Sequence, residues 1–112
     1  MKVYIAAPYT KGDVAMNVNR VLVIADKLLE KGHAPYVPHL THFWHIVSPK
    51  PWDTWLKLDL EFLSICDVVL RLDGESAGAD REEAQAIKLG IPVVHSIDII
   101  PVKVTQSKRR GK

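Results

Sequence analysis

The 112-residue sequence has only one cysteine, Cys66, and no apolar run long enough to cross a lipid bilayer. A single cysteine cannot form a disulfide within the chain, and a chain without disulfides suits a reducing compartment, so we expect a cytoplasmic protein. A membrane-spanning helix needs about 20 consecutive apolar residues, so no membrane partner is expected. The chain opens instead on a short strand-like pattern at residues 3–7.

Acidic residues are missing from the last ten positions, 103–112, which carry five lysines and arginines. The rest of the chain has 10 basic and 13 acidic residues, a net charge of −3. Nucleic-acid-binding domains present a basic face, so this mildly acidic body argues against a nucleic-acid partner. The basic segment 103–112 is predicted to be a disordered tail, because it has little apolar surface to bury.

Apolar residues recur at strand spacing and at helical spacing in alternate segments of the chain. The clearest helix covers residues 17–31, and Gly32 stands where a helix C-cap glycine belongs. The other segments are assigned in the same way. Strands are expected at residues 3–7, 34–37, 67–72 and 91–95, helices at 17–31, 52–66 and 80–89, a further short element at 97–104, and an ambiguous stretch at 39–50.

Strands separated by helices of this length predict a parallel sheet with right-handed crossovers. We expect one α/β domain over residues 1–102, a flavodoxin- or Rossmann-like three-layer sandwich with four or five parallel strands. Such sheets bind ligands at the carboxyl ends of the strands, where the strand order reverses. In a flavodoxin-like order this crevice lies between the first and third strands, flanked by the loops at residues 8–13 and 73–78.

The loop after the third expected strand has the residues of an oxygen-binding site. Ser76 offers a hydroxyl and Gly78 allows close approach, so both are candidate ligands for a phosphate or a sugar, although a plain strand-to-helix turn explains them equally well. Asp80 and Glu83 have the spacing of a capping box, which gives Glu83 a structural role. Glu82 has no such role, and in a first helical turn the helix dipole would keep its carboxylate ionised.

The pattern Ser76-x-Gly78-x-x-x-Glu82, preceded by the strand at 67–70 and followed by residues 90–93, resembles the nucleoside 2-deoxyribosyltransferase superfamily. It is closest to the small members that include 2'-deoxynucleoside 5'-phosphate N-hydrolases. In that family the glutamate of a Ser-x-Gly-x-Gly-x-Glu loop attacks the anomeric carbon and forms a glycosyl-enzyme intermediate. The resemblance therefore implies that Glu82 is the nucleophile.

The same resemblance extends over most of the chain. The segment at residues 4–10 matches the family's first strand and its loop, and Asp59 matches a recurrent aspartate that orients the nucleophile or a sugar hydroxyl. Small relatives complete their sites as dimers, so a homodimer or higher homo-oligomer is implied. Three positions depart from the pattern: Asp80 stands at the second loop glycine, and Glu83-Ala84 stands at the usual Leu-Gly.

Cleavage at an anomeric carbon needs a second carboxyl group, which first protonates the leaving base and then activates a water molecule. Asp59 is the best candidate, and Asp73, at the end of the third strand, is the runner-up. Substrate contacts are expected from the loop residues Pro8, Tyr9 and Thr10, and from Asp73. We therefore expect cleavage or transfer of the N-glycosidic bond of (deoxy)nucleosides or their monophosphates. The alternative is a non-catalytic nucleotide-binding or sensor module on the same fold.

Three histidines, His39, His42 and His45, invite a zinc hypothesis. At a spacing of three residues on a helix, the third ligand rotates away from the first, so we expect neither a metal nor a cofactor. His39 or His42 is expected instead at the rim of the crevice, where a neutral imidazole binds a base or relays a proton, and His39 is the expected substrate-binding residue of the two. The aromatic residues of the same region are expected in the core or at a subunit interface: Phe43, Trp44, Trp52 and Trp55.

Overall fold

The computed structural model describes residues 1–102, so the tail expected at 103–112 lies outside the described residues. In chain order the elements are β1 (Lys2–Ala6), α1 (Val14–Glu30), β2 (Ala34–Tyr36), the 3₁₀ helix η1 (Pro38–Leu40), α2 (Thr41–Val47), α3 (Trp52–Leu63), β3 (Val68–Arg71), α4 (Ala77–Lys88), β4 (Val93–Val94) and the 3₁₀ helix η2 (Ile97–Ile99). Strands and helices alternate as the sequence pattern predicts.

The four strands form one parallel sheet in the order β2-β1-β3-β4. The central pair is in register from Val3 opposite Val68 to Ala6 opposite Arg71. The chain turns from one side of β1 to the other between β2 and β3, so the strand order reverses between β1 and β3. The expected flavodoxin-like α/β sandwich is confirmed, with four strands, and its crevice falls at the carboxyl ends of β1 and β3.

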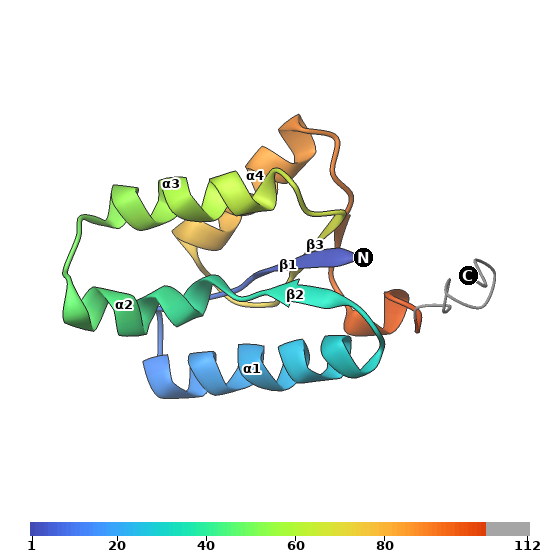
Figure 1. Cartoon of the computed structure of the whole chain (residues 1–112), viewed down its shortest axis with the longest axis horizontal. Helices are drawn as coiled ribbons and strands as arrows, with labels where there is room; N and C mark the ends of the chain where they lie inside the picture. The colour runs from blue at the N-terminus through green and yellow to red at the C-terminus, as the bar shows by residue number, and fades with distance from the viewer. Residues whose placement is uncertain (103–112) are drawn as a thin grey trace, which may run out of the picture.

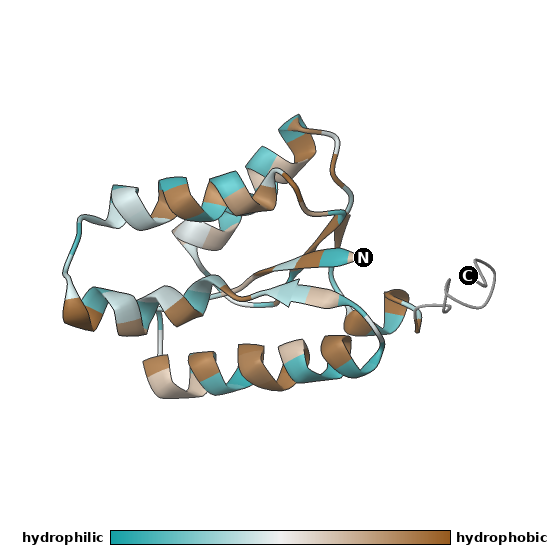
Figure 2. Cartoon of the chain, in the orientation of Figure 1, coloured by the Kyte–Doolittle hydropathy of each residue, from teal (hydrophilic) through white to brown (hydrophobic). Residues whose placement is uncertain are grey.

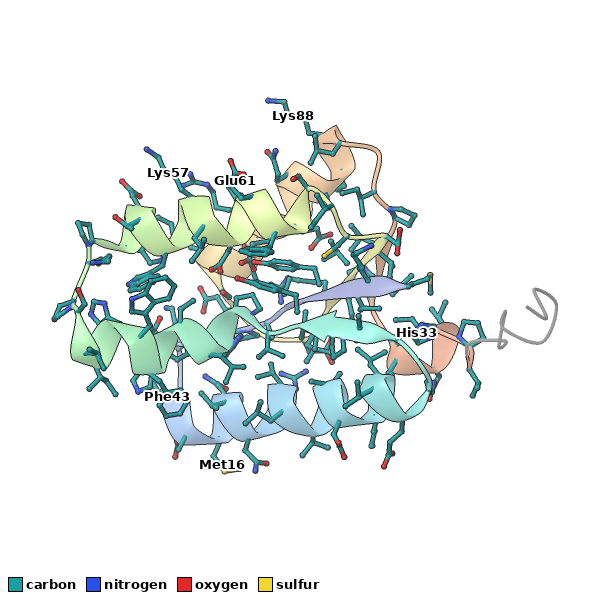
Figure 3. All side chains as sticks on the ribbon, in the orientation of Figure 1. Met16, His33, Phe43, Lys57, Glu61 and Lys88 are labelled. Carbon is teal, nitrogen blue, oxygen red and sulfur yellow. The ribbon has the colours of Figure 1, made fainter. Side chains whose placement is uncertain are left out.

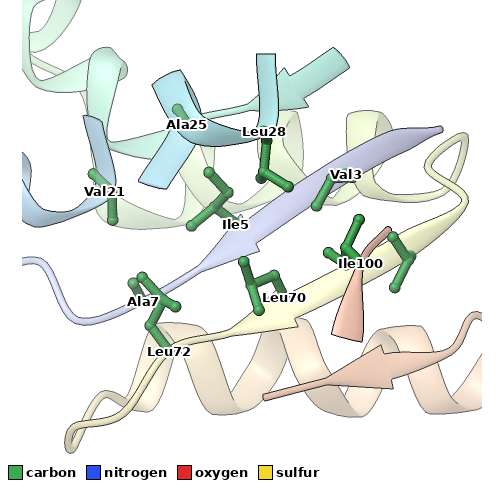
Figure 4. Packing of buried hydrophobic residues seen from close by; sticks show 10 residues of the cluster. Val3, Ile5, Ala7, Val21, Ala25, Leu28, Leu70, Leu72 and Ile100 are labelled. Carbon is green, nitrogen blue, oxygen red and sulfur yellow. The ribbon is translucent and has the colours of Figure 1, made fainter. Parts of the chain in front are cut away.

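Helices cover both faces of the sheet, because both faces of the central strands are apolar. Alternate residues of a strand point to opposite faces, and Val3 and Ile5 of β1 face α1. Val21, Ala25 and Leu28 project from α1 onto this face, as Figure 4 shows. The other face of the sheet carries α3 and α4, which lie on the opposite side of the sheet from α1 in Figure 1. The result is a three-layer sandwich.

Helix α4 begins earlier than the sequence pattern suggests. Ser76, in an extended conformation, is the N-cap, and its hydroxyl accepts a hydrogen bond of 3.1 Å from the backbone N–H of Ala79. The expected capping box of Asp80 and Glu83 is therefore wrong, and Glu82 lies in the second turn of the helix. The expectation failed because serine and aspartate are equally good caps, and only the backbone decides between them.

The expected and observed bounds also differ slightly at the ends of other helices and strands. Helix α1 starts at Val14, because Asp13 caps it by accepting a 3.1 Å hydrogen bond from Met16 N. The fourth strand is reduced to Val93–Val94, and the part of the expected element at 97–104 that lies within the described residues contains the turn of η2.

Among residues 1–102, no helix is long and apolar enough to span a membrane. The longest helix, α1, alternates between hydrophobic and hydrophilic residues along its length in Figure 2, as a helix packed on one side of a sheet does.

The two loops that border the crevice touch at Gly74. Its φ is +122°, and a Cβ atom built there would lie 2.6 Å from Cγ of Pro8. Gly12 also has a positive φ, +80°, but a Cβ atom there would meet nothing within 4 Å. Substituting alanine for each of these two glycines therefore separates the free-energy cost of backbone strain from the cost of a steric clash.

We predict that Gly12→Ala lowers the free energy of unfolding by about 1 kcal/mol through backbone strain alone. Gly74→Ala should cost at least about 1 kcal/mol more, because the methyl group collides with Pro8. Urea unfolding of both variants measures the difference. Equal losses would show that the two loops do not pack as closely as the structure indicates.

Candidate active site

A cavity of about 550 Å³ opens where the loops after β1 and β3 meet. Its walls come from these two loops, from η1 and α2, and from the facing sides of α3 and α4. The lining includes most residues expected at the site: Glu82, Asp59, Tyr9, Thr10, His39, Ser76 and Gly78. The crevice predicted from the strand order is therefore a real cavity that contains both candidate catalytic carboxyl groups.

Two buried carboxyl groups, those of Glu82 and Asp59, belong to this cavity. Their residues are only 6% and 7% exposed. The hydroxyl of Tyr4 donates a hydrogen bond to Oε2 of Glu82, and the hydroxyl of Tyr36 donates one of 3.2 Å to Oδ1 of Asp59. The two tyrosine rings stack with their centroids 5.4 Å apart. The four side chains form one connected unit on the face of the sheet that α3 and α4 cover.

Both carboxyl groups are buried because the helices that carry them turn them toward the sheet. Asp59 shares the buried stripe of α3 with Leu56 and Leu63. Glu82 shares the buried stripe of α4 with Ala79 and Ala86. The small alanine side chains allow α4 to lie close to the strands, which brings the Glu82 carboxyl within reach of Tyr4 in β1.

Burial changes the ionisation of both acids. Burial raises the pKa of Glu82 to about 8. The hydrogen bond from Tyr4 and the Arg71 charge act against this rise in pKa, whereas the Asp59 charge adds to it. Burial also raises the pKa of Asp59 to about 7, against the lowering effect of the Tyr36 hydrogen bond. The expectation that a helix dipole keeps Glu82 ionised is therefore wrong. Desolvation outweighs a dipole that acts mainly on the first turn.

The loop after β1 forms one wall and is held from inside. Asn17 of α1 donates side-chain hydrogen bonds to the backbone carbonyls of Tyr9 (2.9 Å) and Lys11 (2.7 Å). These two hydrogen bonds hold Tyr9, Thr10 and Lys11 along the cavity.

Two residues expected to bind substrate, Pro8 and Asp73, are not among the lining residues. Pro8 is buried, and its carbonyl accepts a 2.8 Å hydrogen bond from Nε2 of His39. Asp73 is exposed, and its backbone carbonyl accepts a 2.7 Å hydrogen bond from Arg20. Both residues shape the loops around the cavity.

The three histidines line the cavity but have separate partners. Nδ1 of His42 accepts a hydrogen bond from the hydroxyl of Tyr9, and Nδ1 of His45 accepts one of 2.9 Å from Nε1 of Trp55. His39 is buried, and with Nε2 bonded to Pro8 its Nδ1 has no partner among the described residues. Within residues 1–102, no group of three histidine, cysteine, aspartate or glutamate side chains is placed to hold a metal ion.

Aromatic side chains gather beside the histidines. Trp52 and Trp55 line the cavity, and the rings of Trp44 and Trp55 meet edge to face at 5.1 Å. Phe43, Trp44 and Trp52 are each more than half exposed. A place in the core is therefore wrong for these three residues, which lie on α2 and at the start of α3.

Two further residues of the carboxyl unit, Tyr4 and Tyr36, do not follow from the sequence motifs. The available signal is a tyrosine within an otherwise aliphatic strand, since a buried hydroxyl needs a partner. Which partner it has depends on the position of α3 and α4 over the sheet, which the local sequence does not specify.

The fold and the site define an α/β protein with a ligand cavity at the switch point of its sheet and two buried acids inside. The chain belongs to the family described as Domain of unknown function (DUF7768), whose model matches residues 1–96. Among curated proteins, none matches the chain.

The solved structures with a similar fold include a 2-deoxyribosyltransferase from the psychrotolerant bacterium Bacillus psychrosaccharolyticus. The TM-score is 0.64 at 21% sequence identity, and the match covers 83% of this chain and 69% of that chain. At this identity the similarity establishes the shared α/β fold.

We predict that the Glu82 carboxyl makes stability depend on pH. An unfolded glutamate loses its proton near pH 4.5, whereas folded Glu82 keeps it up to about pH 8. The folded state binds the extra proton over this window, so its stability falls as the pH rises from about 5 to about 8. The Glu82→Gln variant has no such proton, so its stability should not fall in this way. Its free energy of unfolding should therefore exceed that of the parent protein by an amount that grows over the same window, to at least about 1 kcal/mol at pH 8.

Thermal or urea unfolding at several pH values measures this difference, with Glu61→Gln as the control. Glu61 lies on the outer side of α3, away from the sheet, as Figure 3 shows, and is exposed. The free energy of unfolding of Glu61→Gln should change with pH in the same way as that of the parent protein. A Glu82→Gln advantage that does not change with pH would contradict a raised pKa.

Proposed function

We propose that this protein cleaves or transfers the N-glycosidic bond of (deoxy)nucleosides or their monophosphates, with Glu82 as the nucleophile. The observation that carries the proposal is the pair of buried carboxyl groups, Glu82 and Asp59, in one cavity at the switch point of the sheet. The similarity in fold to a 2-deoxyribosyltransferase supports the same class of substrate.

In the first step the Glu82 carboxylate attacks the anomeric carbon, the bond from that carbon to the base nitrogen breaks, and the sugar becomes esterified to Glu82. Tyr4 holds Oε2 of Glu82 by its hydrogen bond and so fixes the orientation of the carboxyl group. The attacking form must be ionised. The positive charge that develops on the sugar in the transition state stabilises this form, and the Arg71 charge favours it as well.

Asp59 then serves as the acid and base of the reaction. Its pKa of about 7 suits proton transfer near neutrality, because an effective general acid or base titrates near the working pH. It donates a proton to the departing base and accepts one from the water, or the second base, that attacks the sugar ester. Tyr36 holds the Asp59 carboxyl in place through Oδ1.

The walls of the cavity suit the other parts of a nucleotide. Lys11 and Lys50 line the cavity and supply positive charge for a phosphate, next to the N-terminus of α4 with Ser76 as its cap. Trp52 and Trp55, beside the histidines, offer flat faces to a base. His39 belongs to the cavity wall, where its Nε2 donates to the carbonyl of Pro8 and holds the loop after β1.

We predict that Glu82→Gln loses turnover by at least about 1,000-fold, because no other group replaces a missing nucleophile. The assay is incubation with a panel of deoxynucleosides and their 5'-monophosphates, followed by chromatography for the free base. Glu61→Gln is the control and should stay within about twofold of the parent. Substrate binding without any release of base would favour the alternative, a nucleotide-binding or sensor module.

A covalent intermediate is the direct sign of this mechanism. A 2-fluoro-substituted deoxynucleoside with a good leaving group should slow both steps and trap the sugar on the enzyme. Mass spectrometry should then find one added sugar mass on the peptide that contains Glu82. Proton NMR of the normal product should show the configuration of the substrate, because two inverting displacements retain it. An inverted product, or an adduct elsewhere, would exclude the nucleophilic role.

We also propose that two copies of the chain associate through α2 and α3. A second, largely apolar groove lies between the edge strand β2 and these helices, lined among others by Leu40, Trp44 and Phe62. These three side chains are each more than 40% exposed. Another copy presenting the same apolar surface would cover the groove in a self-complementary contact.

For this interface we predict that the parent protein elutes with the mass of two chains in size-exclusion chromatography with light scattering. Leu40→Glu should give the mass of one chain, because it places a charge in an apolar contact. Ile87→Glu alters a similarly exposed residue on α4 and should leave the dimer intact. A single-chain mass for the parent protein would contradict the proposal.

A further inference from the structure

Arg71, the last residue of β3, is a buried arginine beneath the N-terminal half of α4. It points to the same face of the sheet as Val69, two residues earlier, which is the face covered by α3 and α4. The residue is 8% exposed. A buried charge of this kind is costly unless it is fully paired, so its partners are informative.

All three guanidinium nitrogens have partners, and these belong to two segments, the loop after β3 and helix α4. One terminal nitrogen donates to the backbone carbonyl of Leu72, and the other donates to the carbonyl of Gly74 at 3.0 Å and to Oδ1 of Asp80 at 2.9 Å. Nε lies 3.6 Å from Oε1 of Glu83. Arg71 thus joins the end of β3, the loop that follows it and the first two turns of α4.

The two acidic partners are two of the three positions at which the chain departs from the deoxyribosyltransferase pattern. Asp80 and Glu83 are three residues apart, so both face the same side of α4 and meet one guanidinium. Asp80 is not among the residues that line the cavity. The Asp80 carboxylate contacts Arg71 instead. Asp80, Glu83 and Arg71 therefore form one ion-paired cluster beside the cavity.

This cluster bears on Glu82, which lies between Asp80 and Glu83 in the sequence. Glu82 reaches the cavity only if α4 keeps its height and rotation over the strands, since the helix contacts the sheet there through the small side chains of Ala79 and Ala86. Methyl groups hold a helix against sliding only weakly, whereas a bridging guanidinium fixes direction and distance.

We propose that Arg71 is a positioning residue that holds α4 on β3 through Asp80 and Glu83 and so fixes the Glu82 carboxyl in the cavity. This inference rests on the proposed function for its meaning in catalysis, but the position of Glu82 is measurable without turnover. Arg71 touches no part of the cavity itself.

The ionisation of Glu82 reports its surroundings. Tyr4 of β1 donates a hydrogen bond to the carboxyl, Tyr36 of β2 stacks on Tyr4, and the charges of Asp59 in α3 and Arg71 in β3 act on the pKa of Glu82. Arg71 supplies the positive charge of this set and lowers the pKa of Glu82. Loss of the arginine therefore removes the anchor of α4 and also makes Glu82 harder to ionise.

Two substitutions separate these effects. Arg71→Met keeps the length of the side chain and removes the charge, whereas Arg71→Lys keeps the charge and loses the planar fork that bridges the two acids. We expect Arg71→Met to move the acid limb of the kcat/KM pH profile to higher pH. Arg71→Lys should leave that limb in place. Both should lower kcat by about 10- to 100-fold, with KM within about threefold, because a misplaced nucleophile affects the chemical step.

The control is Arg20→Met, which removes an exposed arginine that donates to the carbonyl of Asp73 in the same loop. It should keep kcat within about twofold of the parent and leave the acid limb unmoved. If Arg71→Met does not fold, the double variant Asp80→Asn/Glu83→Gln carries the test. It leaves Arg71 present, removes both ionic partners and should lower kcat in the same way. A fall in melting temperature with unchanged kcat and an unmoved acid limb would overturn the proposal.

A readout without turnover distinguishes failure of this proposal from failure of the proposed function. In protein labelled with 13C at the glutamate carboxyl, the Glu82 signal is identified by its loss in Glu82→Gln. Its titration midpoint should rise in Arg71→Met, and amide exchange at Ala79 should become faster than in Arg20→Met. If the parent protein shows no turnover but these changes appear, Arg71 positions Glu82 for another purpose. An unchanged midpoint and unchanged exchange would exclude the positioning role even in an active enzyme.

Discussion

The hydrogen bond from Tyr4 to the buried carboxyl of Glu82 is the interaction on which the site depends. A carboxyl group without a partner at this depth would cost several kcal/mol, so the fold must supply a donor in the middle of its sheet. That requirement accounts for a tyrosine in β1 and for alanines on the inner stripe of α4. It also accounts for a second tyrosine, Tyr36, which stacks on the first and holds Asp59.

The parallel sheet explains why these groups meet. In the order β2-β1-β3-β4 the loops after β1 and β3 leave the sheet side by side, and the helices that follow β2 and β3 return over the same face. Side chains from all four segments therefore converge at one edge. The cavity is a consequence of strand order, and the residues on its walls give it a chemical character.

Stability and chemistry oppose each other in this cavity. Two acids with raised pKa values destabilise the folded state at neutral pH, and a site retains such groups when their reactivity is useful. The ion-paired cluster of Arg71, Asp80 and Glu83 lies directly beside them and is well satisfied. In the proposed mechanism, this paired cluster is what would hold the nucleophile in position.

The sequence by itself determined the alternation of strands and helices, the parallel sheet and the two loops at its carboxyl edge. These follow from local periodicity and from the short, apolar form of buried strands. It also singled out Glu82 and Asp59, through a resemblance in the motif around residues 76–82. The roles of these residues remain a proposal.

Only the tertiary structure decided that Ser76 caps α4, that Asp80 and Glu83 pair with Arg71, and that Tyr4 bonds to Glu82. Each of these contacts joins residues whose separation depends on how a helix lies over a sheet. Periodicity shows which side of a helix is buried, but it does not show how far the helix slides or turns along the strands. That placement also decided how deeply Glu82 is buried, and burial decided its ionisation.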